Sequence, residues 1–131
     1  MKKLYALVFI SLLAISSRAS ELAGSFKEAC VLAGAQQQER SEQAYIHLDL
    51  APYYKKKYSP VYQSCLRSTE HSDTSSFSFV AAIGKDGRVL RLYVDHETNI
   101  FACVRHTLEQ DKFPAPPVAP HYFYVSMSFG N

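Results

Sequence analysis

The stretch from Phe77 to Phe129 restricts the fold most, because the spacing of its apolar residues changes twice along the chain. They recur first at every second position, then at three- and four-residue steps, and then again at every second position. The first spacing is typical of half-buried strands and the second of an amphipathic helix. Gly84 and Gly87 interrupt the first alternating segment, as expected for a hairpin turn. The stretch therefore predicts strand, turn, strand, helix and strand.

The expected helix has its own start and stop signals. Thr98 or Asn99 can accept a backbone N–H bond and cap the N-terminus. The segment Phe113–Pro117 ends the helix, because proline cannot continue it. The apolar face of this helix is expected to consist of Ile100, Cys103, Val104, Thr107 and Leu108.

The residues before the first strand favour helices. Ser59 followed by Pro60 predicts a helix start, since serine is a good N-cap and proline suits the first helical position. The segment 20–58 is interpreted as one or two further helices. The predicted fold class is α+β, a small three-stranded, mostly antiparallel sheet in the order β-β-α-β with N-terminal helices packed on it. The direction of the last strand relative to the second stays open.

The N-terminus is typical of a secretory signal. A basic start, Met1–Lys3, precedes an apolar run of about a dozen residues, and small residues flank Arg18. We expect cleavage after residue 19 and a single mature domain over 20–131, of which 59–131 is the helix plus the β-β-α-β core. An uncleaved anchor is the alternative, but the run is short of the roughly 20 residues that span a bilayer. Cleavage predicts a periplasmic or secreted protein without stable membrane insertion.

The charge of the mature chain argues against nucleic-acid binding. The whole chain has 14 basic and 12 acidic residues. Without Lys2, Lys3 and Arg18 the basic residues number 11, so the net charge falls to about −1. The run Lys55–Lys57 is interpreted as a solvated helix face or turn.

Three cysteines in an exported chain are candidates for a disulfide bond. Three single pairings exist. We favour Cys65–Cys103, because both residues lie on the inward faces of predicted helices. Cys30 would then be free, buried or intermolecular.

From Val61 to Phe129 the chain resembles the TonB C-terminal-like fold, and within it the two-cysteine AgmX/PglI C-terminal branch. The matching features are Cys65, the turn at 84–89, Cys103–Val104, the proline motif at 113–116 and the final strand at 124–129. The resemblance implies a β-β-α-β core and peptide binding, and it supports the Cys65–Cys103 bridge. The long proline-rich spacer of TonB-type transducers is missing, so the transducer role is not carried over.

Catalytic and metal-binding patterns are weak. Asp95, His96 and Glu97 form the densest polar cluster and would serve a metal-dependent or hydrolytic enzyme if they converged. Adjacent residues point in different directions, so a solvated connection is the preferred interpretation. His121, at the start of the last strand, is expected at the surface. No nucleophile motif or zinc spacing is present, and we predict neither an enzyme nor a cofactor.

A protein- or peptide-binding module of the cell envelope is the leading hypothesis. The last strand can accept a partner strand at a sheet edge, and the residues expected to face the partner are Tyr122, Tyr124, Ser126 and Ser128. Packing of these tyrosines under the N-terminal helices is the alternative. A second candidate surface comprises Tyr53, Tyr54, Tyr58 and Tyr62 with the neighbouring lysines. The alternative is that the chain is an inhibitor or immunity protein of a secreted enzyme. The loop 70–76 of this chain would then contact the enzyme.

Overall fold

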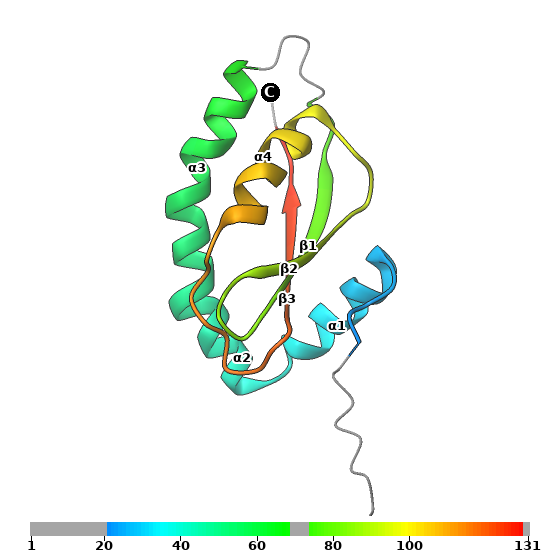
Figure 1. The fold of residues 1–131 in the computed structure, drawn as a ribbon, viewed down its shortest axis with the longest axis vertical. Helices are drawn as coiled ribbons and strands as arrows, with labels where there is room; N and C mark the ends of the chain where they lie inside the picture. The colour runs from blue at the N-terminus through cyan, green and yellow to red at the C-terminus, as the bar shows by residue number, and fades with distance from the viewer. Residues whose placement is uncertain (1–20, 69–73, 130–131) are drawn as a thin grey trace, which may run out of the picture.

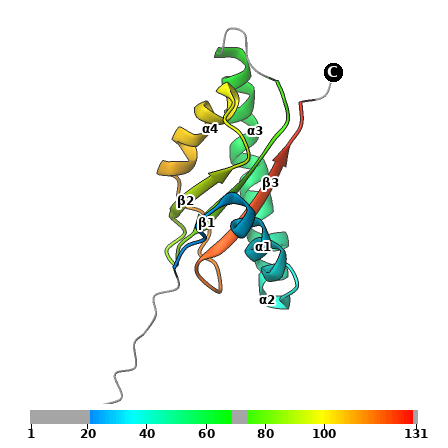
Figure 2. The same cartoon turned by 90° about the vertical axis from the view of Figure 1, so that its right-hand side faces the viewer.

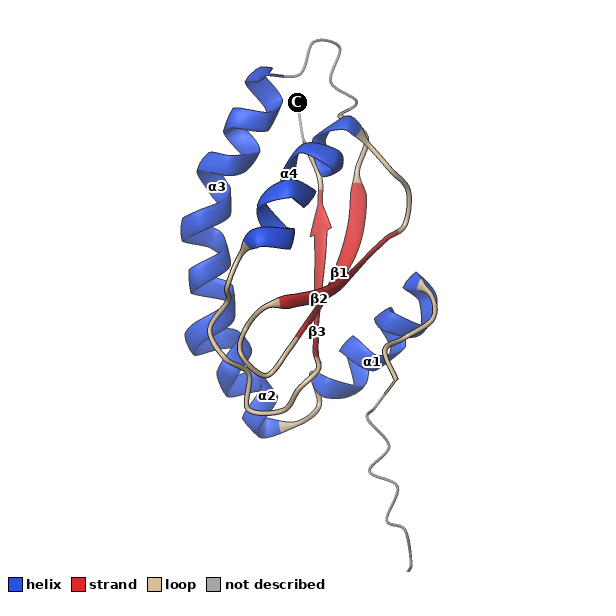
Figure 3. Ribbon diagram, viewed as in Figure 1, coloured by secondary structure: helices blue, strands red, loops and turns tan. Residues whose placement is uncertain are grey.

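The computed structural model describes residues 21–68 and 74–129. The expected signal segment, 1–19, lies outside the described residues, as does most of the loop 70–76. The elements follow in the order α1 (Phe26–Gln36), α2 (Arg40–Tyr45), η1 (Ile46–Leu50), α3 (Ala51–Ser68), β1 (Phe77–Ile83), β2 (Val89–Val94), α4 (Asn99–Gln110) and β3 (His121–Met127) (Figure 3). The predicted α+β class and the β-β-α-β order are confirmed.

The sheet has β1 at its centre. Its order is β2-β1-β3, and both pairings are antiparallel. The last strand therefore returns beside the first, with Phe77 opposite Met127 and Ile83 opposite His121. Because β2 and β3 are both antiparallel to β1, β3 runs parallel to β2, which is the direction that the sequence leaves open. The strand order places β3 at an edge of the sheet.

Both faces of the sheet are covered by helices. Figure 1 shows α3 and α4 on one side and α1 on the other, and Figure 2 looks onto the sheet from the side of α1. Phe77 and Phe79 of β1 face α3 and α4, whereas Val80 packs toward α1. Although the spacing is typical of half-buried strands, the second face of the sheet is therefore also buried in part. Small residues Ala29 and Ala33 let α1 approach closely and bury that face.

One long helical segment precedes the sheet, because α2, η1 and α3 follow each other without a break. The predicted start at Ser59–Pro60 is wrong, since Pro60 lies inside α3. Proline has no backbone N–H, so the carbonyl of Lys56 loses its hydrogen-bond partner within the helix. Lys56 and Pro60 are both exposed, so this carbonyl faces water. The hydroxyl of Ser59 donates to the carbonyl of Lys55 at 2.6 Å instead of capping a helix.

The hairpin between β1 and β2 requires its second glycine. Gly87 has a φ of +91°, and a Cβ at this position would lie 1.9 Å from the carbonyl oxygen of Phe113. The N–H of Phe113 also donates to the carbonyl of Gly87 at 2.9 Å. The turn therefore fixes the chain that leaves α4.

Helix α4 is attached to α3 by a disulfide bond. Thr98 caps α4, as predicted, by accepting the N–H of Phe101 at 3.0 Å. Cys65 of α3 and Cys103 of α4 are bonded, with their Cα atoms 5.9 Å apart. The predicted pairing is confirmed, and Cys30 has a free thiol. A disulfide bond is consistent with an oxidising compartment.

Candidate functional site

The outer edge of β3 presents backbone groups that the sheet does not use. In an antiparallel pair, alternate residues exchange hydrogen bonds and the others point away. The N–H of Tyr122 points away from β1, because it donates to the side chain of Gln36 at 2.7 Å. By the same alternation the N–H and C=O groups of Tyr124 and Ser126 point outward. Among the described residues no strand pairs with this edge.

Gln36, at the end of α1, closes one end of the edge. Its amide oxygen accepts from Tyr122, and its amide nitrogen donates to the carbonyl of Pro120 at 2.8 Å. These two bonds are of the kind that a neighbouring strand would make. Outward-facing backbone groups are therefore available to hydrogen-bond an added strand from Tyr124 onward but not at Tyr122, and a segment residue opposite Phe123 would lie next to the first bonded position.

A hollow of about 330 Å³ borders the edge on the side of α3, and we call it the α3 hollow. The hydroxyls of Tyr54 and Tyr62 bond each other at 2.7 Å, which leaves their rings as apolar walls. Burial raises the pKa of Tyr62 to about 12, so this hydroxyl stays neutral. The lining residues are Ala51, Tyr54, Lys55, Tyr58, Ser59, Tyr62, Phe123 and Met127.

A second hollow borders the edge on the side of α1, with a volume of about 290 Å³, and we call it the α1 hollow. Burial and then the Asp95 carboxylate raise the pKa of the Cys30 thiol above its ordinary value. Cys30 therefore serves as a neutral wall and a weak nucleophile. The lining residues are Cys30, Ala33, Gly34, Gln37 and Tyr124.

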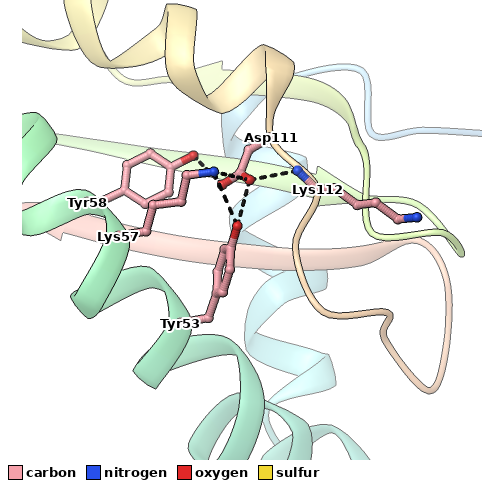
Figure 4. A network of polar contacts seen from close by, with 5 residues as sticks. All are labelled: Tyr53, Lys57, Tyr58, Asp111 and Lys112. Atoms are coloured by element: carbon pink, nitrogen blue, oxygen red, sulfur yellow. Dashed lines mark hydrogen bonds and ion pairs between the residues drawn. The ribbon is translucent and has the colours of Figure 1, made fainter.

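A buried carboxylate, Asp111, fixes the helix that carries the α3 hollow. It follows α4 and accepts from Lys57 at 2.6 Å and from the hydroxyls of Tyr53 and Tyr58 at 2.7 Å each (Figure 4). The backbone N–H of Lys112 adds a fourth bond at 2.7 Å. Burial alone would raise the pKa of Asp111, but these hydrogen bonds outweigh it and hold the pKa below its ordinary value.

A second buried pair, Glu42 and His121, lies at the start of β3. His121 Nδ1 bonds Glu42 Oε2, and the ring of Tyr45 contacts the imidazole edge-on at 4.9 Å. Burial lowers the pKa of His121, an effect that the Glu42 carboxylate only partly offsets. Within the described part of the chain, Glu42 Oε1 and His121 Nε2 are buried without hydrogen-bond partners.

The structure separates the predicted partner-facing residues. Tyr122 is only 5% exposed, and its hydroxyl accepts the N–H of Ala23 at 3.1 Å, so the prediction that it faces a partner is wrong. The cause is α1, which covers this end of β3. Tyr124 is 41% exposed, and Ser126 and Ser128 are also at the surface. Tyr124 and Ser126 both contact the hydroxyl of Ser78, at 3.2 Å.

The other candidates divide in the same way. Of the tyrosines on α3, Tyr58 and Tyr62 are buried in the core, so the second predicted surface is mostly packing. Asp95 accepts the N–H groups of Ser78 and His96, whereas Glu97 bonds Arg105. The Asp95 carboxylate and the His96 ring are 3.1 Å apart, but Glu97 bonds Arg105, so the three side chains do not converge on one point. No group of three or more metal-ligating side chains occurs in residues 21–68 and 74–129.

Reasoning from the sequence misses three features of the site. Gln36 lies in a glutamine run that favours only a helix, and its role needs the position of β3. Asp111 follows a helix that proline ends, and its side-chain partners on α3 lie 53 to 58 positions earlier in the chain, so no local pattern indicates its role. His121 was expected at the surface and is instead fully buried, although its place at the start of an apolar strand was a usable signal.

Comparisons with protein-family models, with curated proteins and with solved structures find no match to this chain. In the ranges that the structure describes, the helices are too short or too polar to cross a membrane. The β3 edge and its two hollows are the features of the described residues that bear on function.

Proposed function

We propose that the chain is an exported module that binds a protein of the cell envelope by adding an extended segment of that partner to the outer edge of β3. The observation that carries this proposal is the outward-facing backbone of Tyr124 and Ser126 between two hollows. An added strand gains affinity from main-chain hydrogen bonds and specificity from pockets for alternate side chains.

The two hollows suit the alternation of an added strand. A segment residue opposite Val125 points to the side of α3, because side chains at opposed positions share a face of the sheet. Its neighbours, opposite Tyr124 and Ser126, point to the side of α1. Successive side chains of one segment would therefore enter the α3 hollow and the α1 hollow in turn.

Export supports the same proposal. The Cys65–Cys103 bond is consistent with an oxidising compartment, and the N-terminal signal predicted from the sequence would deliver the chain to the periplasm or the exterior. The inhibitor alternative was assigned to the loop 70–76, most of which the structure does not describe. No observation favours it over strand addition.

A proline substitution tests strand addition directly. The N–H of Ser126 faces outward, so Ser126→Pro removes a donor that the β1–β3 ladder does not use, and proline is tolerated at such edge positions. The control Ser126→Ala removes the same hydroxyl but keeps the N–H. Both variants are compared with the original chain for binding to decapeptides selected from a random displayed library.

The expected result is that Ser126→Ala keeps binding and Ser126→Pro loses it, while both variants unfold at the same urea concentration. Amide resonances of Tyr124 and Ser126 should shift when a selected peptide is added to the original chain. Selected peptides that bind Ser126→Pro as well as the original chain would overturn the proposal, and so would a library that yields no binding peptide.

A further inference from the structure

Helix α3 forms the basic side of the α3 hollow. It carries Lys55, Lys56, Lys57 and Arg67 and contains no acidic residue. The ammonium group of Lys57 is engaged by Asp111 at 2.6 Å. Lys55 lines the α3 hollow, and Lys55 and Lys56 are both exposed. Asp49, the acidic residue that precedes α3 most closely, does not line this hollow.

The opposite wall of the α3 hollow is apolar. Phe123 and Met127 of β3 contribute it, and β3 has no acidic side chain. Tyr54 contacts Phe123 with ring centroids 5.3 Å apart, whereas Tyr62 contacts Phe129 at 6.3 Å. Helix α3 and β3 therefore run alongside each other in the same direction. Lys55, next to Tyr54, lies toward the Phe123 end of the hollow.

The positions of these residues indicate which side chains of an added segment the α3 hollow can accommodate. Strand residues that point to the same face are two positions apart. A side chain opposite Val125 would lie between Phe123 and Met127, in apolar surroundings. The next side chain on that face, opposite Phe123, would lie at the end of the hollow that Lys55 lines.

Building on the proposed function, we infer that the segment added to β3 is acidic, with a carboxylate beside Lys55 two positions from a large apolar side chain in the α3 hollow. The Lys55 ammonium attracts the carboxylate, and the apolar side chain leaves water for the ring walls of Tyr54 and Tyr62. The charge sets the choice of partner more than the affinity, because the ion pair is at the surface.

A charge reversal at Lys55 tests the inference. Decapeptides from a random displayed library are selected on the exported chain and on its Lys55→Glu variant. The original chain should enrich Asp or Glu two positions from an aromatic or large aliphatic residue. Lys55→Glu should enrich Lys or Arg at that position. Lys56→Glu is the matched control, since it makes the same change in net charge outside the hollow and should keep the acidic preference.

The size of the effect is measured with one selected peptide and a copy in which lysine replaces each acidic residue. The acidic peptide should bind the original chain about two- to fivefold more tightly at low salt, and the difference should shrink at 1 M salt, where the Debye length is about 3 Å. Lys55→Glu should reverse the order of the two peptides.

The outcomes separate this inference from the proposed function. Peptides that lose binding with Ser126→Pro but show no acidic preference would overturn the inference and leave strand addition standing. An acidic preference that Lys56→Glu reverses as strongly as Lys55→Glu would also overturn it, because the net charge and not the hollow would then be responsible. Peptides indifferent to Ser126→Pro would overturn the proposed function.

Discussion

Two buried carboxylates hold helices in this fold, and they are held differently. At the α3–α4 junction, Asp111 accepts four hydrogen bonds, from Lys57, Tyr53, Tyr58 and a backbone N–H. At the α2–β3 junction, Glu42 bonds one partner, His121, and each of the two side chains keeps a buried atom without a hydrogen bond. Both carboxylates are almost fully buried, so the contrast lies in the bonding.

The difference indicates which junction stabilises the fold. A buried charge costs free energy unless hydrogen bonds compensate it, and a partly satisfied pair is often no better than apolar residues of the same size. The α3–α4 junction meets the first condition and is reinforced by a disulfide bond. The α2–β3 junction is a partly satisfied pair of this kind. It lies at the start of β3, the strand that we propose as the binding edge.

Removing the disulfide bond should have the largest effect, because it is the covalent part of the α3–α4 junction. The variant Cys65→Ser with Cys103→Ser should lose about 4 kcal/mol of unfolding free energy, as expected for a closed loop of 38 residues. The loss is measured by urea unfolding of this variant and of the original chain with its disulfide bond intact. Cys30→Ser is the control and should leave the midpoint nearly unchanged, and an equal shift in both variants would contradict the prediction.

Removing Asp111 should have the next largest effect. Asp111→Ala leaves the buried hydroxyl of Tyr58 without its acceptor, which costs about 2–3 kcal/mol. Lys57→Met is the matched control, since the Lys57 side chain is 41% exposed and the Asp111 carboxylate keeps its three other hydrogen bonds, so the loss should be about 1 kcal/mol. Equal losses in the two variants would show that the ion pair, and not the tyrosine bonds, stabilises the junction.

The contrast between the junctions also marks what the sequence could predict. The periods within 77–129 predicted three strands and a helix, and the inward positions of Cys65 and Cys103 predicted the disulfide bond. Tyr122 and His121 were misplaced because their burial depends on α1 and α2, which come from a segment with weak periodicity. Asp111 and Gln36 act across long sequence separations, and no local pattern reports such contacts.

Mild acid should distinguish the two junctions. Burial lowers the pKa of His121, so the unfolded chain takes up a proton near pH 6.5 while the folded chain does not. Stability from His121 is therefore complete above this pH and is lost as the pH falls below it, by at most about 1.4 kcal/mol per pH unit. Asp111 has a lowered pKa, so its contribution is lost only below about pH 4.

Urea unfolding at pH 7.5 and pH 5.5 measures this difference. The original chain and Asp111→Asn should both lose about 1 kcal/mol between these values, because His121 is present in each. A variant without His121 should show a smaller loss. A loss of the same size in that variant would assign the acid sensitivity to other groups.

Replacing the whole α2–β3 pair should have the smallest effect. Glu42→Met with His121→Leu removes two buried groups that are only half bonded, so the unfolding free energy should change by less than about 1 kcal/mol or rise. His121→Leu alone should cost about 3 kcal/mol, because it leaves the Glu42 carboxylate buried without its partner. Urea unfolding at pH 7.5 measures both. If the double variant lost as much as the single one, the pair would stabilise the fold as Asp111 does, and the contrast between the junctions would fail.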